Sequence, residues 1–330
     1  MTSFRQLQCF SRFNHPLKSV IITIMIHTFK PSRYYNTIGW HEPALLIHDG
    51  DTVITSCVCA AGMDEHEKTI TQRPNPMSGP FYIEGAQPSD TLAVTFDRIT
   101  PNRPFGWTRN VLAQNVVDPD YVHRLPDRSA GVGRWQADVA AGTATLVSPE
   151  TKLGTLSLPL NPMVGCFGVA PALGQAISTA TSAEHGGNMD YNGFVAGVTV
   201  YFAVNAPGAL FHLGDAHAVQ GDGEISGTGI EISSEIQFTV RVLKDTHNIW
   251  PRGENVDYIF TCGNARPLDQ ALQHATTEMS RWLMADYGLD GVAVGLLMGQ
   301  AVKYEIGNVF DPAYTVVCKM PKKILAQFTH

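Results

Sequence analysis

The sequence is poor in positive charge, and what it has is unevenly spread. It holds 23 Lys and Arg against 30 Asp and Glu, and none of the former lies between Leu153 and Val240, where average usage would give about six. That stretch nevertheless carries many acids and histidines: Glu184, Asp190, Asp215, Asp222, Glu224, Glu231, Glu235, His185, His212 and His217. Clustered buried carboxylates repel one another and take up protons, so a divalent metal is the simplest source of compensating charge. The alternative is that these acids are solvated on loop tips, or that basic groups reach them from elsewhere in the fold.

Two further absences narrow the class of protein. The net charge is −7, and the resulting lack of a basic surface argues against nucleic acid or an anionic membrane as a partner. The six cysteines form no CxxC pair, which argues against a disulfide framework and a thiolate zinc site. We therefore expect a soluble cytoplasmic protein that acts on a small molecule.

The N-terminal segment differs in composition from the rest. The first acid is Glu42, and an apolar run extends from Val20 to Ile26. This run is far too short to span a bilayer and lacks the small-residue cleavage site of a signal peptide. Met25 is an alternative start. We interpret residues 1–26 as a disordered or spurious extension and expect one domain over residues 27–330.

The pattern of apolar residues predicts a mainly β fold. Short alternating runs broken by Gly, Pro and Asp predict strands, the clearest of them within 51–59, 79–85, 91–96, 193–204 and 229–242. Such strands build a sandwich or a barrel. A small C-terminal portion is predicted to be helical, with one helix from Pro267 to about Gly288 and a second from Val292 to Lys303 whose apolar stripe faces the core.

Three glycine-bracketed segments hold the candidate chemistry. In the first, Pro162 to Pro171, a tight turn would point backbone amides at a ligand oxygen, with Cys166 at its apex. That thiol is either a nucleophile or, as its surroundings favour, buried and inert. The second segment, His185 to Asp190, places an imidazole, the Asn188 carboxamide and a carboxylate on a flexible hinge, which is costly to order unless it binds something.

The third segment runs from Gly214 to Glu224. On a continuing strand Asp215 and His217 point to the same face, as two ligands of one metal should. We interpret Asp222 as a turn residue, and Glu224 beyond it as a general base or a further ligand. The mixture of imidazole and carboxylate favours zinc or another first-row metal, with calcium as the alternative.

These segments closely resemble the acetamidase/formamidase family. The resemblance rests on 75–86, 165–171, 185–190, 207–211, 214–217 and 220–224, and it extends from about residue 27 to Pro321. It implies a β-rich single-domain fold, homo-oligomeric assembly and hydrolysis of small linear amides to carboxylate and ammonia. Some members act on γ-lactams, and some bind zinc or calcium.

The resemblance also suggests roles for particular residues. His185, Asp215 and His217, together with Asp190, would hold the metal, and Glu224 or Glu84 would transfer the proton. Asn188 and the amides of the Gly165 to Gly168 segment would orient the substrate. Three alternatives stay open: an amidase with Cys166 as its nucleophile, a γ-lactamase, and a non-catalytic protein that binds a metal or a small molecule.

Overall fold

The computed structural model describes residues 24–127, 129, 131–246 and 248–328. Residues 1–23 of the predicted N-terminal extension lie outside the described residues. The first strand, β1, begins at Ile26. Just before it, the backbone N–H of Met25 donates to Asp51 Oδ1 at 2.9 Å, so the chain is already tied to the body of the protein at this point.

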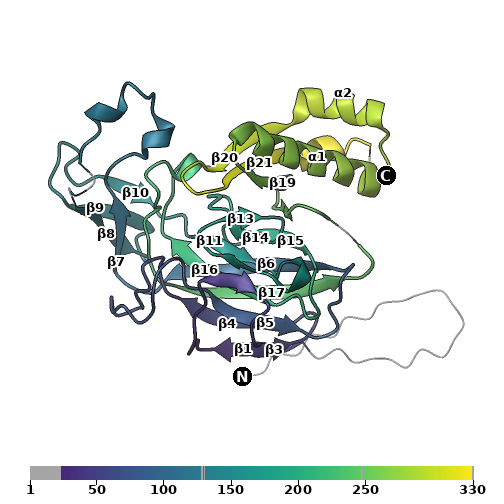
Figure 1. The fold of residues 1–330 in the computed structure, drawn as a ribbon, viewed down its shortest axis with the longest axis horizontal. Helices are drawn as coiled ribbons and strands as arrows, with labels where there is room; N and C mark the ends of the chain where they lie inside the picture. Colours follow the sequence, from purple (N-terminus) through teal and green to yellow (C-terminus); the bar gives the residue numbers. More distant parts are fainter. Residues whose placement is uncertain (1–23, 128, 130, 247, 329–330) are drawn as a thin grey trace, which may run out of the picture.

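The prediction of a mainly β fold is confirmed, and in the described residues the strands form two large sheets and two small ones (Figure 1). The largest sheet has nine strands, in the order β1 (Ile26–Phe29), β4 (Thr52–Cys57), β17 (Ser234–Leu243), β6 (Thr91–Pro101), β15 (Thr199–Ala203), β18 (Arg252–Glu254), β19 (Tyr258–Ala265), β21 (Tyr314–Pro321) and β20 (Lys303–Asn308). The second has six, in the order β13 (Ser182–Ala183), β14 (Gly186–Asn188), β11 (Met163–Gly168), β16 (Phe211–His217), β5 (Ser78–Ile83) and β3 (Leu45–Ile47).

The small sheets lie beside this pair. One consists of β10 (Ser157–Pro159), β9 (Thr143–Ser148), β8 (Val132–Asp138) and β7 (Phe105–Arg109), and the other of β12 (Ala176–Ser178) and β2 (Thr37–Gly39). In Figure 1 the four-stranded sheet projects at the left, at the opposite end of the molecule from the helices. Four 3₁₀ turns are described: η1 (Gln114–Val116), η2 (Val122–Arg124), η3 (Ala172–Gly174) and η4 (Asp222–Glu224).

Aromatic side chains join the two large sheets into a sandwich. Phe167 of β11 meets Phe96 of β6 edge to face with ring centroids 5.0 Å apart, and Phe211 of β16 meets Phe238 of β17 at 5.3 Å. All four rings are fully buried. Edge-to-face pairs of this kind add to the free energy of apolar burial, so the core fixes how the six-stranded sheet sits on the nine-stranded one.

The C-terminal helices cover one end of the nine-stranded sheet (Figure 1). Helix α1 (Leu268–Tyr287) ends at Gly288, whose φ of 65° matches a left-handed helix cap. Its buried face packs on β19 and β21. Helix α2 (Gly291–Ala301) follows, and α3 (Lys322–Leu325) closes the chain. Both predicted helices are confirmed.

The predicted burial of the second helix holds only in part. Val294 and Met298 of α2 are buried, whereas Val292 and Leu296 are 73% and 70% exposed. An apolar sequence therefore does not by itself show how much of a helix is covered. Among the described residues, no helix has both the length and the apolar character needed to cross a membrane.

Candidate active site

Strand pairing assembles one half of a buried acid cluster. His217, at the end of β16, and Glu231 form an isolated antiparallel bridge, which places their side chains on one face. His217 Nε2 lies 3.0 Å from Glu231 Oε1 and 3.4 Å from Asp215 Oδ1. The three side chains are buried, so their charges interact with little screening.

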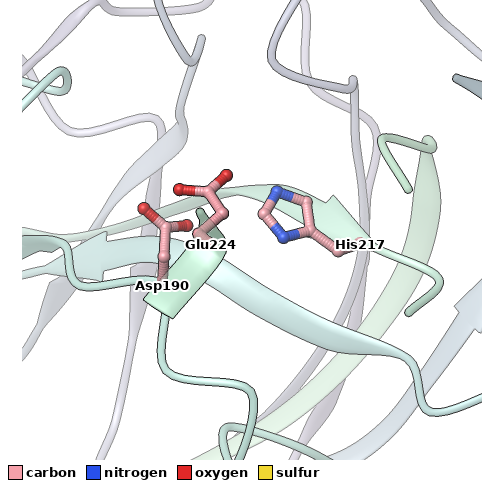
Figure 2. Close-up of side chains that lie close together, drawn as sticks. All are labelled: Asp190, His217 and Glu224. Atoms are coloured by element: carbon pink, nitrogen blue, oxygen red, sulfur yellow. The ribbon is translucent and has the colours of Figure 1, made fainter. Parts of the chain in front are cut away.

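The other half contains Asp190, Glu224 and Asp311, and Asn308 holds it together. Asn308 Nδ2 lies 2.9 Å from Asp190 Oδ2, 2.9 Å from Glu224 Oε2 and 2.8 Å from Asp311 Oδ2. Figure 2 shows Asp190 and Glu224 side by side, with the His217 ring beside Glu224. Five carboxylates thus surround one imidazole and one carboxamide.

The backbone is strained at three of these carboxylates. Asp190, Asp215 and Glu224 have φ values of 44°, 58° and 47°, in the left-handed region that non-glycine residues seldom adopt. Strain of this kind persists where the surrounding structure imposes it, and it gathers at functional sites. Gly165 adds a steric requirement, because a Cβ there would lie 2.3 Å from Asp190 Oδ1.

Burial and mutual repulsion keep protons on the cluster. Burial, together with neighbouring acids, raises the pKa of Asp190 and of Glu224 well above the usual range. It also raises the pKa of Glu231 to about 7 and that of Asp311 to about 6. Burial opposes the charged form of His217, but Glu231 and Asp215 outweigh it and raise its pKa. A cation brought into the cluster would displace these protons.

The cluster has the donor atoms of a metal site. Two overlapping groups, Asp190 with His217 and Glu224, and Asp215 with His217 and Glu231, each offer ligand atoms within 4.8 Å of one another. Asp190 Oδ1 and Asp215 Oδ1 are buried without a hydrogen-bond partner among the described residues. Buried oxygens normally have a partner, so the residues present fit a divalent metal.

A polar cavity of about 180 Å³ opens over the cluster. Its wall includes Asp215, Glu224, Glu231 and Asp311 together with Asn75, Asn188, Trp107, Phe310, Arg73 and Arg109. Asn75 Nδ2 donates to Asn188 Oδ1 at 2.6 Å, and Asn188 Nδ2 donates to Asp311. Pockets for drug-sized ligands are larger, about 300–1,000 Å³, so this one suits a small molecule.

The structure brings Asp190, Asp215, His217 and Glu224 together, with Asn188 at the edge of the cluster, as the sequence led us to expect. It does not bring His185 there. This side chain is 2% exposed and lines a separate cavity of about 300 Å³. Burial lowers its pKa to about 4. Strand β14 separates the two residues, since His185 precedes it and Asp190 follows it.

Glu84 is placed elsewhere as well. It follows β5 at the surface, where its side chain is 56% exposed and its Oε2 lies 3.0 Å from His48 Nδ1. Glu84 belongs to segment 75–86, but β5 carries it to the end of the sheet away from the cavity wall.

Cys166 is buried in the middle of β11, not at the apex of a turn. The predicted turn at Gly165 to Gly168 was wrong, since these residues belong to a strand paired with β14 and β16. Burial, with added repulsion from Asp215 and Asp190, raises the pKa of the thiol well above its usual value. Both effects oppose formation of a thiolate.

Sequence reasoning missed Glu231, Asn308 and Asp311 as site residues. Glu231 carried a signal, because it belongs to the stretch without Lys or Arg, but nothing in the sequence pairs it with His217. Asn308 ends β20, and Asp311 lies in the connection from β20 to β21; both are far from the motifs, and no local pattern marks them.

A β-sandwich with a buried carboxylate–histidine cluster beneath a small polar cavity defines a class of protein, and comparison with known proteins identifies it. The model of the Acetamidase/Formamidase family matches residues 143–327. The chain belongs to the acetamidase/formamidase family.

Individual relatives agree with this assignment. An acetamidase of Mycolicibacterium smegmatis is 35% identical over 245 residues, 58% of this chain and 59% of the relative. A formamidase of Methylophilus methylotrophus is 36% identical over 211 residues, 51% and 52%. The chain spans between 52% and 63% of the length of the curated relatives it matches.

Solved structures match over more of the chain. The acetamidase of Yersinia enterocolitica has a TM-score of 0.78 and 31% identity, covering 92% of this chain and 94% of that one. A protein of Thermoanaerobacter tengcongensis described as a predicted acetamidase/formamidase has a TM-score of 0.78 and 26% identity, covering 93% and 99%. A γ-lactamase of Delftia acidovorans, with 18% identity and a TM-score of 0.52, shares the fold.

Proposed function

We propose that this protein hydrolyses the carbon–nitrogen bond of small linear amides of the formamide and acetamide type and releases ammonia. The observation that carries the proposal is the buried cluster of five carboxylates around His217 beneath a cavity of about 180 Å³. Membership of the acetamidase/formamidase family supports the same reaction.

The residues that would hold a metal are Asp190, Asp215, His217 and Glu231, each offering one ligand atom. The imidazole favours zinc, whereas the many carboxylate oxygens keep calcium as the alternative. Bound there, the metal would supply Lewis acidity, which makes water a better nucleophile and polarises an amide carbonyl. His185 has no part in this set.

Glu224 is the residue we assign to proton transfer. Its Oε2 lies within hydrogen-bonding distance of Asn308 Nδ2, which leaves Oε1 to take a proton from the attacking water and return it to the leaving nitrogen. The water oxygen bonds to the carbonyl carbon, the carbon–nitrogen bond breaks, and the transferred proton completes ammonia. Asn188 forms part of the cavity wall and holds Asp311.

Two alternatives to metal-assisted hydrolysis have less support. A Cys166 acyl-enzyme needs an accessible thiolate, and this thiol is fully buried with a raised pKa. A non-catalytic binding protein has less support because the relatives are an acetamidase and a formamidase. A γ-lactam substrate remains an alternative that a substrate panel separates.

We also propose a cytoplasmic, homo-oligomeric protein whose single domain covers residues 27–330. The buried free thiols of Cys57, Cys59, Cys166, Cys262 and Cys318 fit a reducing compartment. Analytical ultracentrifugation of the full chain tests the assembly, and a monomer at micromolar concentration would contradict it.

The deciding experiment measures ammonia release from formamide, acetamide, longer amides and γ-lactam. The purified protein is assayed as isolated, after chelation, and after zinc or calcium is restored. We expect activity to disappear on chelation and to return with zinc. Activity that survives chelation would favour Cys166 as the nucleophile. The absence of activity on every amide would overturn the proposed function.

A further inference from the structure

Strand pairing places Trp107 next to the cluster. The backbone N–H of Trp107 donates to Glu231 O at 3.1 Å, and that of Glu231 donates to Trp107 O at 2.9 Å. Residues that exchange both bonds lie directly opposite each other, and their side chains share one face. Because Glu231 is bridged to His217 as well, Trp107, Glu231 and His217 form a row across three segments.

Three atoms in this row have no hydrogen-bond partner among the described residues, and one of them, His217 Nε2, belongs to the metal-binding group. Trp107 Nε1, a donor, and Glu231 Oε2, an acceptor, are buried and have no hydrogen-bond partner among the described residues. Both side chains line the cavity over the cluster. A buried donor and a buried acceptor left unpaired are costly, and here they occur at neighbouring positions in the wall of one cavity.

We propose that Trp107 and Glu231 recognise the edge of an amide on which the carbonyl oxygen and an N–H lie side by side. Trp107 Nε1–H donates to the carbonyl oxygen, and the amide N–H donates to Glu231 Oε2. This inference rests on the proposed function and narrows its substrate class. A primary carboxamide always presents such an edge, because its nitrogen carries a hydrogen on the carbonyl side.

Acyclic N-substituted amides do not present this edge. Their trans form places the substituent beside the carbonyl oxygen, and the cis form is rare. A γ-lactam is held cis by its ring and keeps the edge. The pair therefore selects primary amides, and admits lactams, over acyclic secondary amides.

Propanamide and N-methylacetamide test this selection, because they are isomers of equal size. Release of the carboxylic acid is measured for both, since their nitrogen products differ. We expect the zinc-loaded wild type to prefer propanamide by about 50-fold or more in kcat/KM, the factor by which the trans form dominates in simple secondary amides.

Trp107→Phe tests the donor, and Trp135→Phe is its matched control. Trp135 Nε1 donates to Thr108 Oγ1 at 3.0 Å, so its hydrogen bond is made within the protein. We expect Trp107→Phe to lower kcat/KM for propanamide by about 100-fold, as the loss of one donor to a reacting oxygen does. Its zinc affinity should equal that of the wild type, and Trp135→Phe should keep wild-type kcat/KM.

Three results would contradict substrate recognition by Trp107 and Glu231. The first is equal hydrolysis of both isomers, and the second is wild-type kcat/KM in Trp107→Phe. The third is a parallel loss of zinc affinity in Trp107→Phe, which would show that Trp107 only supports Glu231. If Trp107→Phe does not fold, the wild-type comparison of the isomers still decides. Wild-type silence on every amide is a different result, because it overturns the proposed function itself.

Discussion

Gln220 Oε1 accepts a hydrogen bond from His217 Nδ1 at 2.7 Å. The same side chain donates through Nε2 to the Asp190 carbonyl oxygen at 2.5 Å. One buried carboxamide thus fixes the imidazole tautomer, directs Nε2 toward Asp215 and Glu231, and ties the two motif segments together. Such an arrangement is typical of the residues that orient metal-binding histidines.

Replacement of Gln220 should therefore weaken metal binding. For Gln220→Leu we expect zinc affinity to fall about 10- to 100-fold, measured by competition with a chromogenic chelator. Gln270→Leu, an exposed change on helix α1, is the control and should bind zinc as the wild type does. Wild-type affinity in Gln220→Leu would show that His217 needs no such support.

The metal-free protein should lose stability as the pH rises. Folding raises the pKa of Asp311 to about 6 and of Glu231 to about 7, above the values of about 4 in an unfolded chain. The folded state therefore binds more protons, and this stabilisation is complete below about pH 4 and lost as the pH passes about 7.

Thermal unfolding after chelation measures this effect. The buried His185 and His212, with pKa values lowered to about 4 and about 3, contribute in the opposite direction. The four acids with raised pKa values outnumber them, so we expect a lower Tm at about pH 8 than at about pH 5. The rise in Tm on adding zinc should grow over the same range, because metal ligands bind in their deprotonated form. Glu231→Gln should flatten the pH dependence of the chelated protein, and an unchanged slope would contradict the assignment.

Two glutamates should respond in opposite ways. Glu224→Gln removes the proposed proton carrier, and we expect kcat to fall by about 10²- to 10⁴-fold. Glu84→Gln changes an exposed side chain beside His48 and should keep wild-type kcat. Steady-state kinetics of both zinc-loaded variants measure these effects. A large loss of kcat in Glu84→Gln, with wild-type kcat in Glu224→Gln, would identify Glu84 as the general base.

The buried thiol should be dispensable. We expect Cys166→Ala to retain wild-type kcat/KM, and Cys166 of the folded protein to resist iodoacetamide, because Sγ is fully buried and its pKa is raised. Mass spectrometry of the alkylated protein and amide kinetics test both points. An inactive but folded Cys166→Ala would revive the acyl-enzyme mechanism.

Local patterns in the sequence predicted the parts of this protein that local interactions determine. Helix α1 follows from apolar residues at helical spacing between Pro267 and Gly288, and the shared face of Asp215 and His217 follows from strand alternation. The left-handed φ of Asp215 does not prevent this, since Asp215 Oδ1 and His217 Nε2 still converge to 3.4 Å.

The site residues that the sequence did not predict are brought to the site by pairing between distant segments. Glu231 becomes a site residue only because the fold sets it opposite His217 and Trp107. Asp311 enters the site only because Asn308, at the end of β20, brings it beside Asp190. No spacing within one segment encodes either contact.

The left-handed backbone at Asp190, Asp215 and Glu224 sets the fold and the chemistry in conflict. Glycine adopts this conformation without a steric penalty, and a glycine there would also remove one of the repelling charges. A library selected for heat resistance alone should therefore enrich glycine at these positions. The selected variants would be heat-resistant and correctly folded but inactive toward amides. The sequence of greatest stability is therefore not the sequence of greatest activity.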